Sequence, residues 1–187
     1  MPTEISGSTG VNKIQDGTVV NADINSNAAI AGSKINGSFG KLLQVVSMYT
    51  DSSTGSPTAT WHSTNVTLAI TPSSTSSKIF AIYDGQMYVQ NTSSDAGMAI
   101  RIEQAISGGA TTYPDELHTR SNVNYSAYYT SVSVGQVGLR VPLSGLVSPN
   151  TTSEITYTLQ FHPHNVNGSG INSLGGRSTL TLMEIAG

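Results

Sequence analysis

Hydrophobic and polar residues alternate in short runs along most of the chain. In EITYTLQFH, residues 154–162, every second residue from Ile155 to Phe161 is apolar, and the residues between them are polar. Such alternation predicts a β-strand with one buried face. Similar runs, rich in β-branched and aromatic residues, predict further strands at residues 41–49, 61–70, 77–83, 86–90, 98–106, 124–134, 136–143 and 178–186.

The predicted strands are separated by stretches of Ser, Thr, Gly, Pro and Asn, and no long helix is predicted. Many short strands with such connections are typical of an all-β sandwich or barrel. The run SKIFAIY, residues 77–83, is apolar on both faces, as expected of a central strand that is covered on each side. Since one face of a sheet in a lone sandwich meets water, this run favours packing between subunits.

Residues 1–40 differ in composition from the rest of the chain. They contain a single aromatic residue, Phe39, so only residues 41–187 are expected to form a core of their own. A charged residue precedes isoleucine four times in this segment, at spacings that fit no heptad. The segment is either a disordered leader or a segment that orders against identical copies or another protein. The isoleucines available for such packing are Ile5, Ile14, Ile24, Ile30 and Ile35.

Charged residues make up only 10% of the 187 residues, and the net charge is −3. No cluster of Lys and Arg is present, which argues against nucleic acid as a partner. Cysteine is absent, so neither a disulfide nor a thiolate metal site is expected. The first residues lack the basic and apolar regions of a signal peptide, and no stretch is apolar enough for a membrane span. We therefore expect synthesis in a cytoplasm without membrane insertion.

Several motifs occur in order along nearly the whole chain: GSTGVNKIQDGTVVNADINSNAAIAGSKI, LLQVVS, LAITPSSTSSKI, SPNTTSEITYTLQ and STLTLMEIAG. These resemble modules of fibre and spike proteins of tailed bacteriophages. The resemblance implies a homotrimer at the virion surface. Residues 1–40 would mount it on a capsid or tail protein, and residues 41–187 would form a jelly roll resembling the tumour-necrosis-factor and complement heads. Residues 85–145 match least.

The resemblance implies a structural virion protein, namely a trimeric fibre, spike or decoration on the head or tail that contacts the host surface. The alternative is a small tailspike-type glycan hydrolase that acts on host envelope polysaccharide with a pair of carboxylates. No nucleophile elbow, zinc-protease helix or phosphate-binding loop is present, and we expect no catalytic residues. Acids available to the alternative are Asp84, Asp95, Glu103, Asp115, Glu116, Glu154 and Glu184.

The tripeptide HPH, residues 162–164, follows the clearest predicted strand. If the strand stays regular past Pro163, His162 and His164 point the same way, and imidazole pairs are good ligands for divalent iron or zinc. Three such pairs in a trimer would supply six nitrogens, and some phage spikes resembling this chain hold an axial metal in that manner. Against a metal, proline commonly ends a strand. Residues 165–176 then predict a loop, with two exposed histidines at its entrance.

Residues 111–129, TTYPDELHTRSNVNYSAYY, mix aromatic and hydrogen-bonding side chains in a predicted long loop that enters a strand. Aromatic faces beside polar groups suit the binding of sugars or proteins. Tyr125 and Tyr129 share one face of the predicted strand, and the alternative is that they belong to the core. The candidates for contact with a host-surface glycan or protein are Tyr113, His118, Arg120 and Tyr128.

Overall fold

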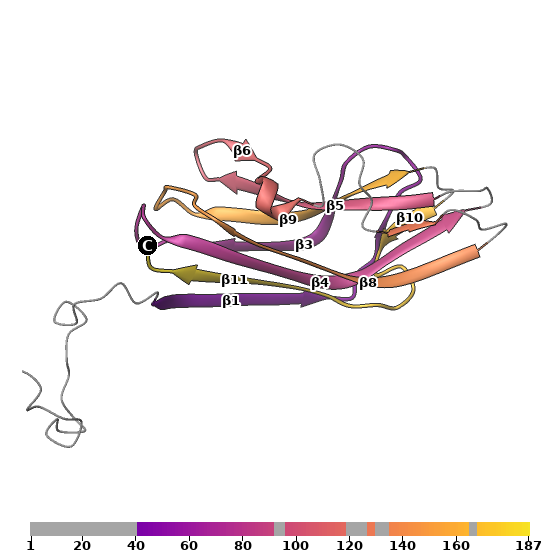
Figure 1. Cartoon of the computed structure of the whole chain (residues 1–187), viewed down its shortest axis with the longest axis horizontal. Coiled ribbons are helices and arrows are strands. Elements are labelled where there is room, and N and C mark those ends of the chain that lie inside the picture. Colours follow the sequence, from indigo (N-terminus) through magenta and orange to yellow (C-terminus); the bar gives the residue numbers. More distant parts are fainter. Residues whose placement is uncertain (1–40, 92–95, 119–126, 130–134, 165–167) are drawn as a thin grey trace, which may run out of the picture. The chain divides into compact units, whose positions relative to one another are not determined.

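The computed structural model describes residues 41–91, 96–118, 127–129, 135–164 and 168–187. All of them lie within one unit, Gly40–Gly187. Two antiparallel sheets pack face to face as a sandwich of jelly-roll type (Figure 1). The prediction of an all-β sandwich is therefore confirmed. The residues proposed for virion attachment lie outside the described residues: Ile5, Ile14, Ile24, Ile30 and Ile35.

The first sheet is built around a long central strand, β4. One edge of β4 pairs with β8 along almost its full length, and the other edge pairs first with β11 and then with β10. β1 pairs with β11, and β2 pairs with β10. The strands of this sheet are β1 (Leu42–Thr50), β2 (Thr54–Gly55), β4 (Lys78–Asn91), β8 (Gly135–Val147), β10 (Gly168–Ile171) and β11 (Ser178–Ile185).

The second sheet has the order β3-β9-β5-β6, and β7 also pairs with β5. β9 is central and bonds to β3 on one side and β5 on the other. The strands of this sheet are β3 (His62–Ile70), β5 (Ala96–Ile106), β6 (Thr111–Thr112), β7 (Ala127–Tyr129) and β9 (Ile155–His164).

The core lies between the sheets and is formed by alternate residues of each strand. Ile155 and Phe161 of β9 are fully buried, as the alternation in residues 154–162 predicts. Ile100 and Ile102 of the neighbouring strand β5 are buried to the same extent. Each such side chain contributes about 1.5–3 kcal/mol to folding through burial. The alternation in the sequence thus shows which side chains of these strands pack in the core.

β4 is one continuous strand, whereas the sequence predicts two runs, residues 77–83 and 86–90. The prediction of a break is wrong because Gly85 belongs to the strand and faces the core. A Cβ atom at Gly85 would overlap the hydroxyl groups of Tyr83 and Ser178. The glycine therefore makes room for two neighbouring side chains and does not end the strand.

Residues 168–171 form strand β10, although the sequence predicts a loop there. β10 pairs with β4 on one side and with β2 on the other. A Cβ atom at Gly170 would overlap the carbonyl oxygen of Thr54, so the close approach of the two backbones requires glycine. Because residues 168–170 are glycine and serine, this strand has no alternation of apolar and polar side chains from which it could be predicted.

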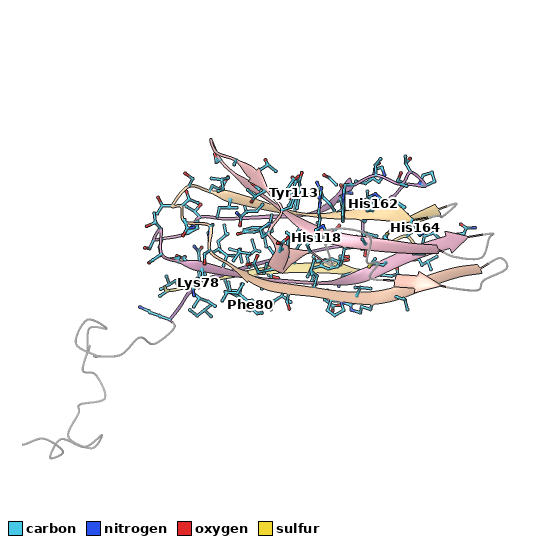
Figure 2. All side chains as sticks on the ribbon, turned by 45° about the horizontal axis from the view of Figure 1, so that its top comes forward. Lys78, Phe80, Tyr113, His118, His162 and His164 are labelled. Atoms are coloured by element: carbon cyan, nitrogen blue, oxygen red, sulfur yellow. The ribbon has the colours of Figure 1, made fainter. Side chains whose placement is uncertain are left out.

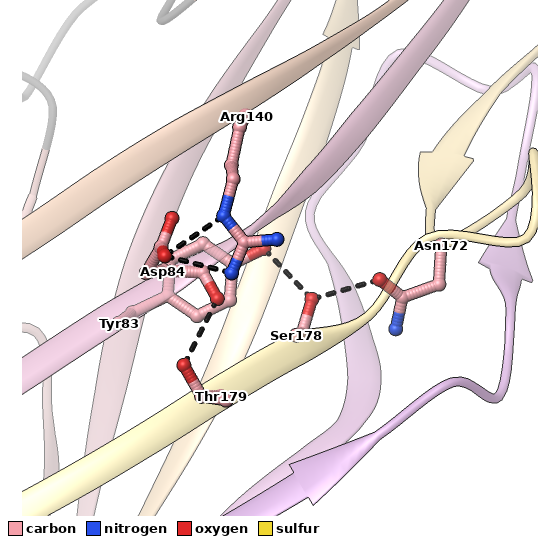
Figure 3. Close-up of polar contacts among 6 residues, drawn as sticks. All are labelled: Tyr83, Asp84, Arg140, Asn172, Ser178 and Thr179. Atoms are coloured by element: carbon pink, nitrogen blue, oxygen red, sulfur yellow. Dashed lines mark hydrogen bonds and ion pairs between the residues drawn. The ribbon is translucent and has the colours of Figure 1, made fainter.

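A chain of hydrogen bonds satisfies the buried hydroxyl group of Tyr83 (Figure 3). Ser178 Oγ donates to Asn172 Oδ1 over 2.9 Å, so the 3.1 Å contact between Ser178 and Tyr83 has the tyrosine hydroxyl as donor. Burial raises the pKa of Tyr83 to about 12, which keeps this hydroxyl protonated. Asn172 adopts a left-handed conformation, with φ 58°, and its Nδ2 donates to the carbonyl oxygen of Thr50 over 3.0 Å. The network fixes the turn before β11 against the end of β1.

A single-turn 3-10 helix, η3 (Asp115–Leu117), contacts β5 of one sheet and β8 of the other. Its Leu117 side chain is fully buried in the core. On β8, Gly145 lies so close to η3 that a Cβ atom there would overlap the carbonyl oxygen of Glu116. The segment therefore covers the core between these two strands, and it does so only because residue 145 has no side chain.

Substitution Gly145→Ala is expected to lower the free energy of unfolding by about 1–3 kcal/mol, because the methyl group must displace η3 and Leu117. Thermal or urea unfolding measures the change. Ser144→Ala, next in sequence and exposed, is the matched control and should change stability little. Equal stability of the two variants would contradict the packing described here.

Candidate functional site

The outer face of the second sheet has one arginine at its centre. Arg101 of β5 lies opposite Gln160 of β9, which in turn lies opposite Ser63 of β3. In the next row, Ala99 lies opposite His162. Because the side chain of Ala99 is small, Trp61, which precedes β3, can lie beside Arg101.

Two aromatic rings enclose the guanidinium group of Arg101. Its Cζ atom lies 4.0 Å from the centroid of the Trp61 ring and 3.6 Å from that of the Tyr113 ring. Arg101 Nε donates a hydrogen bond to Gln160 Oε1 over 2.8 Å. Stacking of this kind is favourable for arginine because its guanidinium is planar and weakly hydrated. The rings and the hydrogen bond together fix the orientation of the group.

Further hydrogen bonds connect Gln160, Glu103 and Tyr113 beside this arginine. Gln160 Nε2 donates to Glu103 Oε2 over 2.9 Å and to Ser63 Oγ over 3.2 Å. Tyr113 donates from its hydroxyl to the same oxygen of Glu103 over 3.1 Å. Gln160 is consequently only 6% exposed, although the alternation of β9 places it on the outer face. We refer to Trp61, Arg101, Glu103, Tyr113 and Gln160 as the Arg101 cluster.

Two histidines extend the cluster on the side of Trp61. The ring centroids of His118 and His162 each lie 5.3 Å from that of Trp61. Burial lowers the pKa of His118, the charge of Arg101 lowers it further, and Asp115 opposes both. His118 is therefore neutral at neutral pH. Burial also lowers the pKa of Arg101, but an arginine stays charged at neutral pH.

The structure unites residues that the sequence assigns to two separate candidate sites. Tyr113 and His118 come from the predicted receptor loop, and His162 comes from the predicted metal pair (Figure 2). Arg120, also a receptor candidate, lies outside the described residues. Tyr128 lies in β7 opposite Gly97, and its side chain is not among those described.

β9 continues through Pro163, so His162 and His164 lie on the same face of the strand. Both are half-buried, and the sequence expectation of two exposed side chains at a loop entrance is wrong in that respect. No group of three or more His, Cys, Asp or Glu residues that could hold a metal ion occurs in the described part of the chain. An axial metal between subunits stays a prediction.

Sequence reasoning did not place the four cluster residues besides Tyr113 in a binding site, and it considered Glu103 only as a possible catalytic acid. They come from separate segments, and only the register of three strands brings them together. The single tryptophan of the chain and the charged pair inside the apolar run of β5 are the available signals. These residues are Trp61, Arg101, Glu103 and Gln160.

The acids considered for glycan hydrolysis are dispersed. Asp84 lies on the outer face of the first sheet, where its Oδ2 accepts a hydrogen bond from Arg140 Nε over 2.8 Å and forms an ion pair with Nη2 over 2.7 Å (Figure 3). Glu103 lies in the Arg101 cluster on the other sheet. Asp95 lies outside the described residues. The expectation that the chain has no catalytic residues stays a prediction.

Apolar side chains form a row across the outer face of the first sheet. Val45 of β1 lies opposite Met183 of β11, Met183 opposite Phe80 of β4, and Phe80 opposite Leu146 of β8. Val45 is 50% exposed and Leu146 42% exposed. Figure 2 places Phe80 on the side of the sandwich away from Tyr113 and His162. The apolar face, as named below, comprises Leu42, Val45, Phe80, Ile82, Leu146, Met183 and Ile185.

The apolar face occupies only one end of the sheet. At the other end, a row of the same register contains Tyr49, Thr179, Asp84 and Pro142. There the guanidinium of Arg177 lies 4.6 Å from the centroid of the Tyr49 ring. The outer surface of this sheet is therefore divided into a largely apolar end, where β1 begins and where the exposed Lys78 lies opposite Ile185, and a polar end.

A buried carboxylate lies beneath the apolar end. Glu184 is 1% exposed and accepts hydrogen bonds from Ser73 N over 2.7 Å, Ser73 Oγ over 2.6 Å and Gln44 Nε2 over 2.7 Å. Burial by itself raises the pKa of Glu184, but the bonds from Ser73 and Gln44 more than offset it and hold the pKa at about 2. The carboxylate therefore joins β11, β1 and the turn before β4 as a charged group.

No protein-family model and no curated protein matches the chain. Two solved structures have a distant likeness to it. The crystal structure of the infectious bursal disease virus VP2 subviral particle has a TM-score of 0.43 and 10% identity, over 76% of this chain and 37% of that chain. The structure of T=1 particles derived from infectious bursal virus has a TM-score of 0.40 and 12% identity, over 75% and 31%. Both TM-scores are low, and we draw no conclusion about this chain from them.

No helix in the described part of the chain is long and apolar enough to cross a membrane.

Substitution Glu184→Gln is expected to lower the free energy of unfolding at pH 7 by about 1–3 kcal/mol, because an amide N–H then faces the donors of Ser73 and Gln44. The pKa of Glu184 is lower in the folded state than its ordinary 4.5, so the unfolded state binds more protons as the pH falls. The stabilisation is present above about pH 4.5 and is lost toward about pH 2.

Urea unfolding between pH 7 and pH 2 measures this prediction. The difference in stability between the wild-type chain and the Glu184→Gln variant should shrink as the pH falls. Glu154→Gln, an exposed position, is the control and should follow the wild type. A difference that does not depend on pH would contradict the charged state assigned to Glu184.

Proposed function

We propose that this chain is a structural, non-enzymatic virion protein, a homotrimeric fibre, spike or decoration mounted on the particle by residues 1–40. The apolar face of the first sheet is the observation that carries this proposal. The motifs resembling phage fibre and spike proteins supply the virion context. The sandwich would project from the particle, with the Arg101 cluster toward the host surface.

The apolar face differs from the equivalent surface of the second sheet. There, outward positions carry hydroxyl groups, such as Thr67 and Thr158, whose Oγ1 atoms are 3.0 Å apart. On the first sheet the same kind of position carries Val45 and Leu146, both exposed. Soluble monomers rarely leave a contiguous apolar patch in water. The chain has few charges that could oppose association through this face. The apolar face therefore supports a second subunit that covers it.

An identical copy is the covering partner that fits the attachment proposed for residues 1–40. These residues join the sandwich at Lys41, whose carbonyl oxygen accepts a hydrogen bond from Ala186 N over 2.9 Å. Leu42 follows directly and belongs to the apolar face. Closed rotational symmetry about this face would bring three joining points together. One particle protein could then hold three N-terminal segments at a single site.

The double substitution Val45→Glu, Leu146→Glu is expected to convert the trimer to monomers. Each glutamate would place a charge in an interface that excludes water. Both positions are exposed, so the sandwich itself should keep its unfolding temperature within a few degrees. Sedimentation velocity at micromolar concentration measures the number of chains in each species.

Thr67→Glu, Ala69→Glu places two charges at exposed positions of β3, on the outer face of the other sheet, and is the matched control. It should sediment like the wild type. A wild-type chain that sediments as a folded monomer would refute the trimer. A trimer that survives the apolar-face substitutions would place the interface elsewhere.

Deletion of residues 1–40 is expected to leave the sandwich folded and trimeric, because its described strands and core begin at residue 42. The shortened protein should no longer be incorporated into particles. Mass spectrometry of purified virions measures incorporation, and circular dichroism of the shortened protein serves as the folding control. Undiminished incorporation would show that residues 1–40 do not mount the protein.

A further inference from the structure

The guanidinium of Arg101 has two terminal nitrogens that no described residue uses as hydrogen-bond donors. Its Nε bonds to Gln160, but no residue of the described chain accepts a hydrogen bond from its two terminal nitrogens. No carboxylate among the described residues lies within ion-pair distance of it either. By contrast, Arg140 on the other sheet uses Nε and Nη2 to bind Asp84.

The setting of these donors is rigid. Trp61 and Tyr113 lie on the guanidinium, and Gln160 fixes its Nε edge, so the terminal nitrogens keep one direction. A group that is held before binding loses little conformational entropy when a ligand arrives. Two parallel N–H groups of a guanidinium match the two oxygens of a carboxylate. Partial desolvation of Arg101 strengthens its attraction for an anion, since less water competes.

The charge around Arg101 selects a singly charged ligand. Glu103 belongs to the same hydrogen-bonded cluster and contributes a negative charge. His118 is neutral at neutral pH, so it adds no positive charge. A phosphate dianion would meet more repulsion from Glu103 than a carboxylate would. Glu103 Oε1 has no hydrogen-bond partner among the described residues and can accept a hydroxyl hydrogen from a neutral part of the same ligand.

We propose that the Arg101 cluster binds a carboxylate-bearing sugar, such as a uronic acid unit of a cell-surface polysaccharide. The sugar carboxylate would bind the two terminal nitrogens of Arg101, and a ring hydroxyl would donate to Glu103 Oε1. The edges of Trp61 and Tyr113 would flank the sugar ring. The site lies on the sheet opposite the apolar face, so it does not require the proposed trimer, and either proposal can fail without the other.

Trp61 makes the proposal directly measurable, because it is the only tryptophan of the chain and contacts Arg101. The full-length protein is titrated with trigalacturonic acid while the tryptophan fluorescence is recorded. We expect a saturable change with a dissociation constant of about 0.1–1 mM. Two comparison ligands are titrated at the same concentrations: the neutral trisaccharide of galactose, and inorganic phosphate. Each should bind at least tenfold more weakly.

Variants assign the binding to Arg101. Arg101→Gln removes the charge, and Arg101→Lys keeps it but loses the paired donors. Each variant should weaken binding by roughly tenfold to a hundredfold, because hydrogen bonds between charged groups are lost. Arg140→Gln is the matched control on the other sheet and should bind like the wild type. Unfolding temperatures show whether each variant is folded, and Arg101→Lys provides the test if Arg101→Gln is not.

Three results would overturn the proposal. An absence of saturable change with trigalacturonic acid would show that the cluster does not bind this class of sugar. Equal binding of the neutral trisaccharide or of phosphate would show that a sugar carboxylate is not what the site recognises. Unchanged binding by folded Arg101→Lys would place the ligand elsewhere. None of these results bears on the oligomeric state, which sedimentation measures separately.

Discussion

The architecture depends on the double coverage of β4. This strand is hydrogen-bonded along both edges, to β8 on one side and to β11 and β10 on the other. Its inward side chains, including Ile79 and Tyr83, are buried in the core. Its outward side chains at the end near β1, Phe80 and Ile82, are apolar as well. A strand with two apolar faces needs a partner on each, and the second sheet covers only one of them.

The two outer surfaces of the sandwich thus have different chemistry. The first sheet presents aliphatic side chains in register, which suit a broad contact with another protein surface. The second presents one arginine within a ring of polar and aromatic groups, which suits a small polar ligand. The chain has few charged residues, and Ser, Thr, Asn and Gly are abundant in its sequence. The apolar face and the Arg101 cluster therefore differ from the uncharged polar surface expected elsewhere. Under the two proposals above, assembly and ligand recognition would use opposite sheets.

Alternation within one strand is visible in the sequence because it concerns neighbours along the chain. Residues 98–106 and 154–162 are predicted for that reason, and their buried faces are correct. The continuity of β4 through Gly85 and the strand at residues 168–171 depend on backbones and side chains from other strands, so local composition misleads. The Arg101 cluster depends on strand register in the same way. The sequence points to some of its aromatic residues but not to the arginine that they enclose.

The position of β11 has a consequence for the making of the protein. β11 lies between β1 and β4, and within the described residues β1 pairs with no other strand. A nascent chain that has not yet released residues 178–185 from the ribosome leaves β1 without hydrogen-bonded neighbours and half of one β4 edge open. The first sheet can therefore close only after β11 has left the ribosome. A product that ends before β11 would expose strand edges with unpaired backbone N–H and C=O groups. We expect chaperones and proteases to bind such a product.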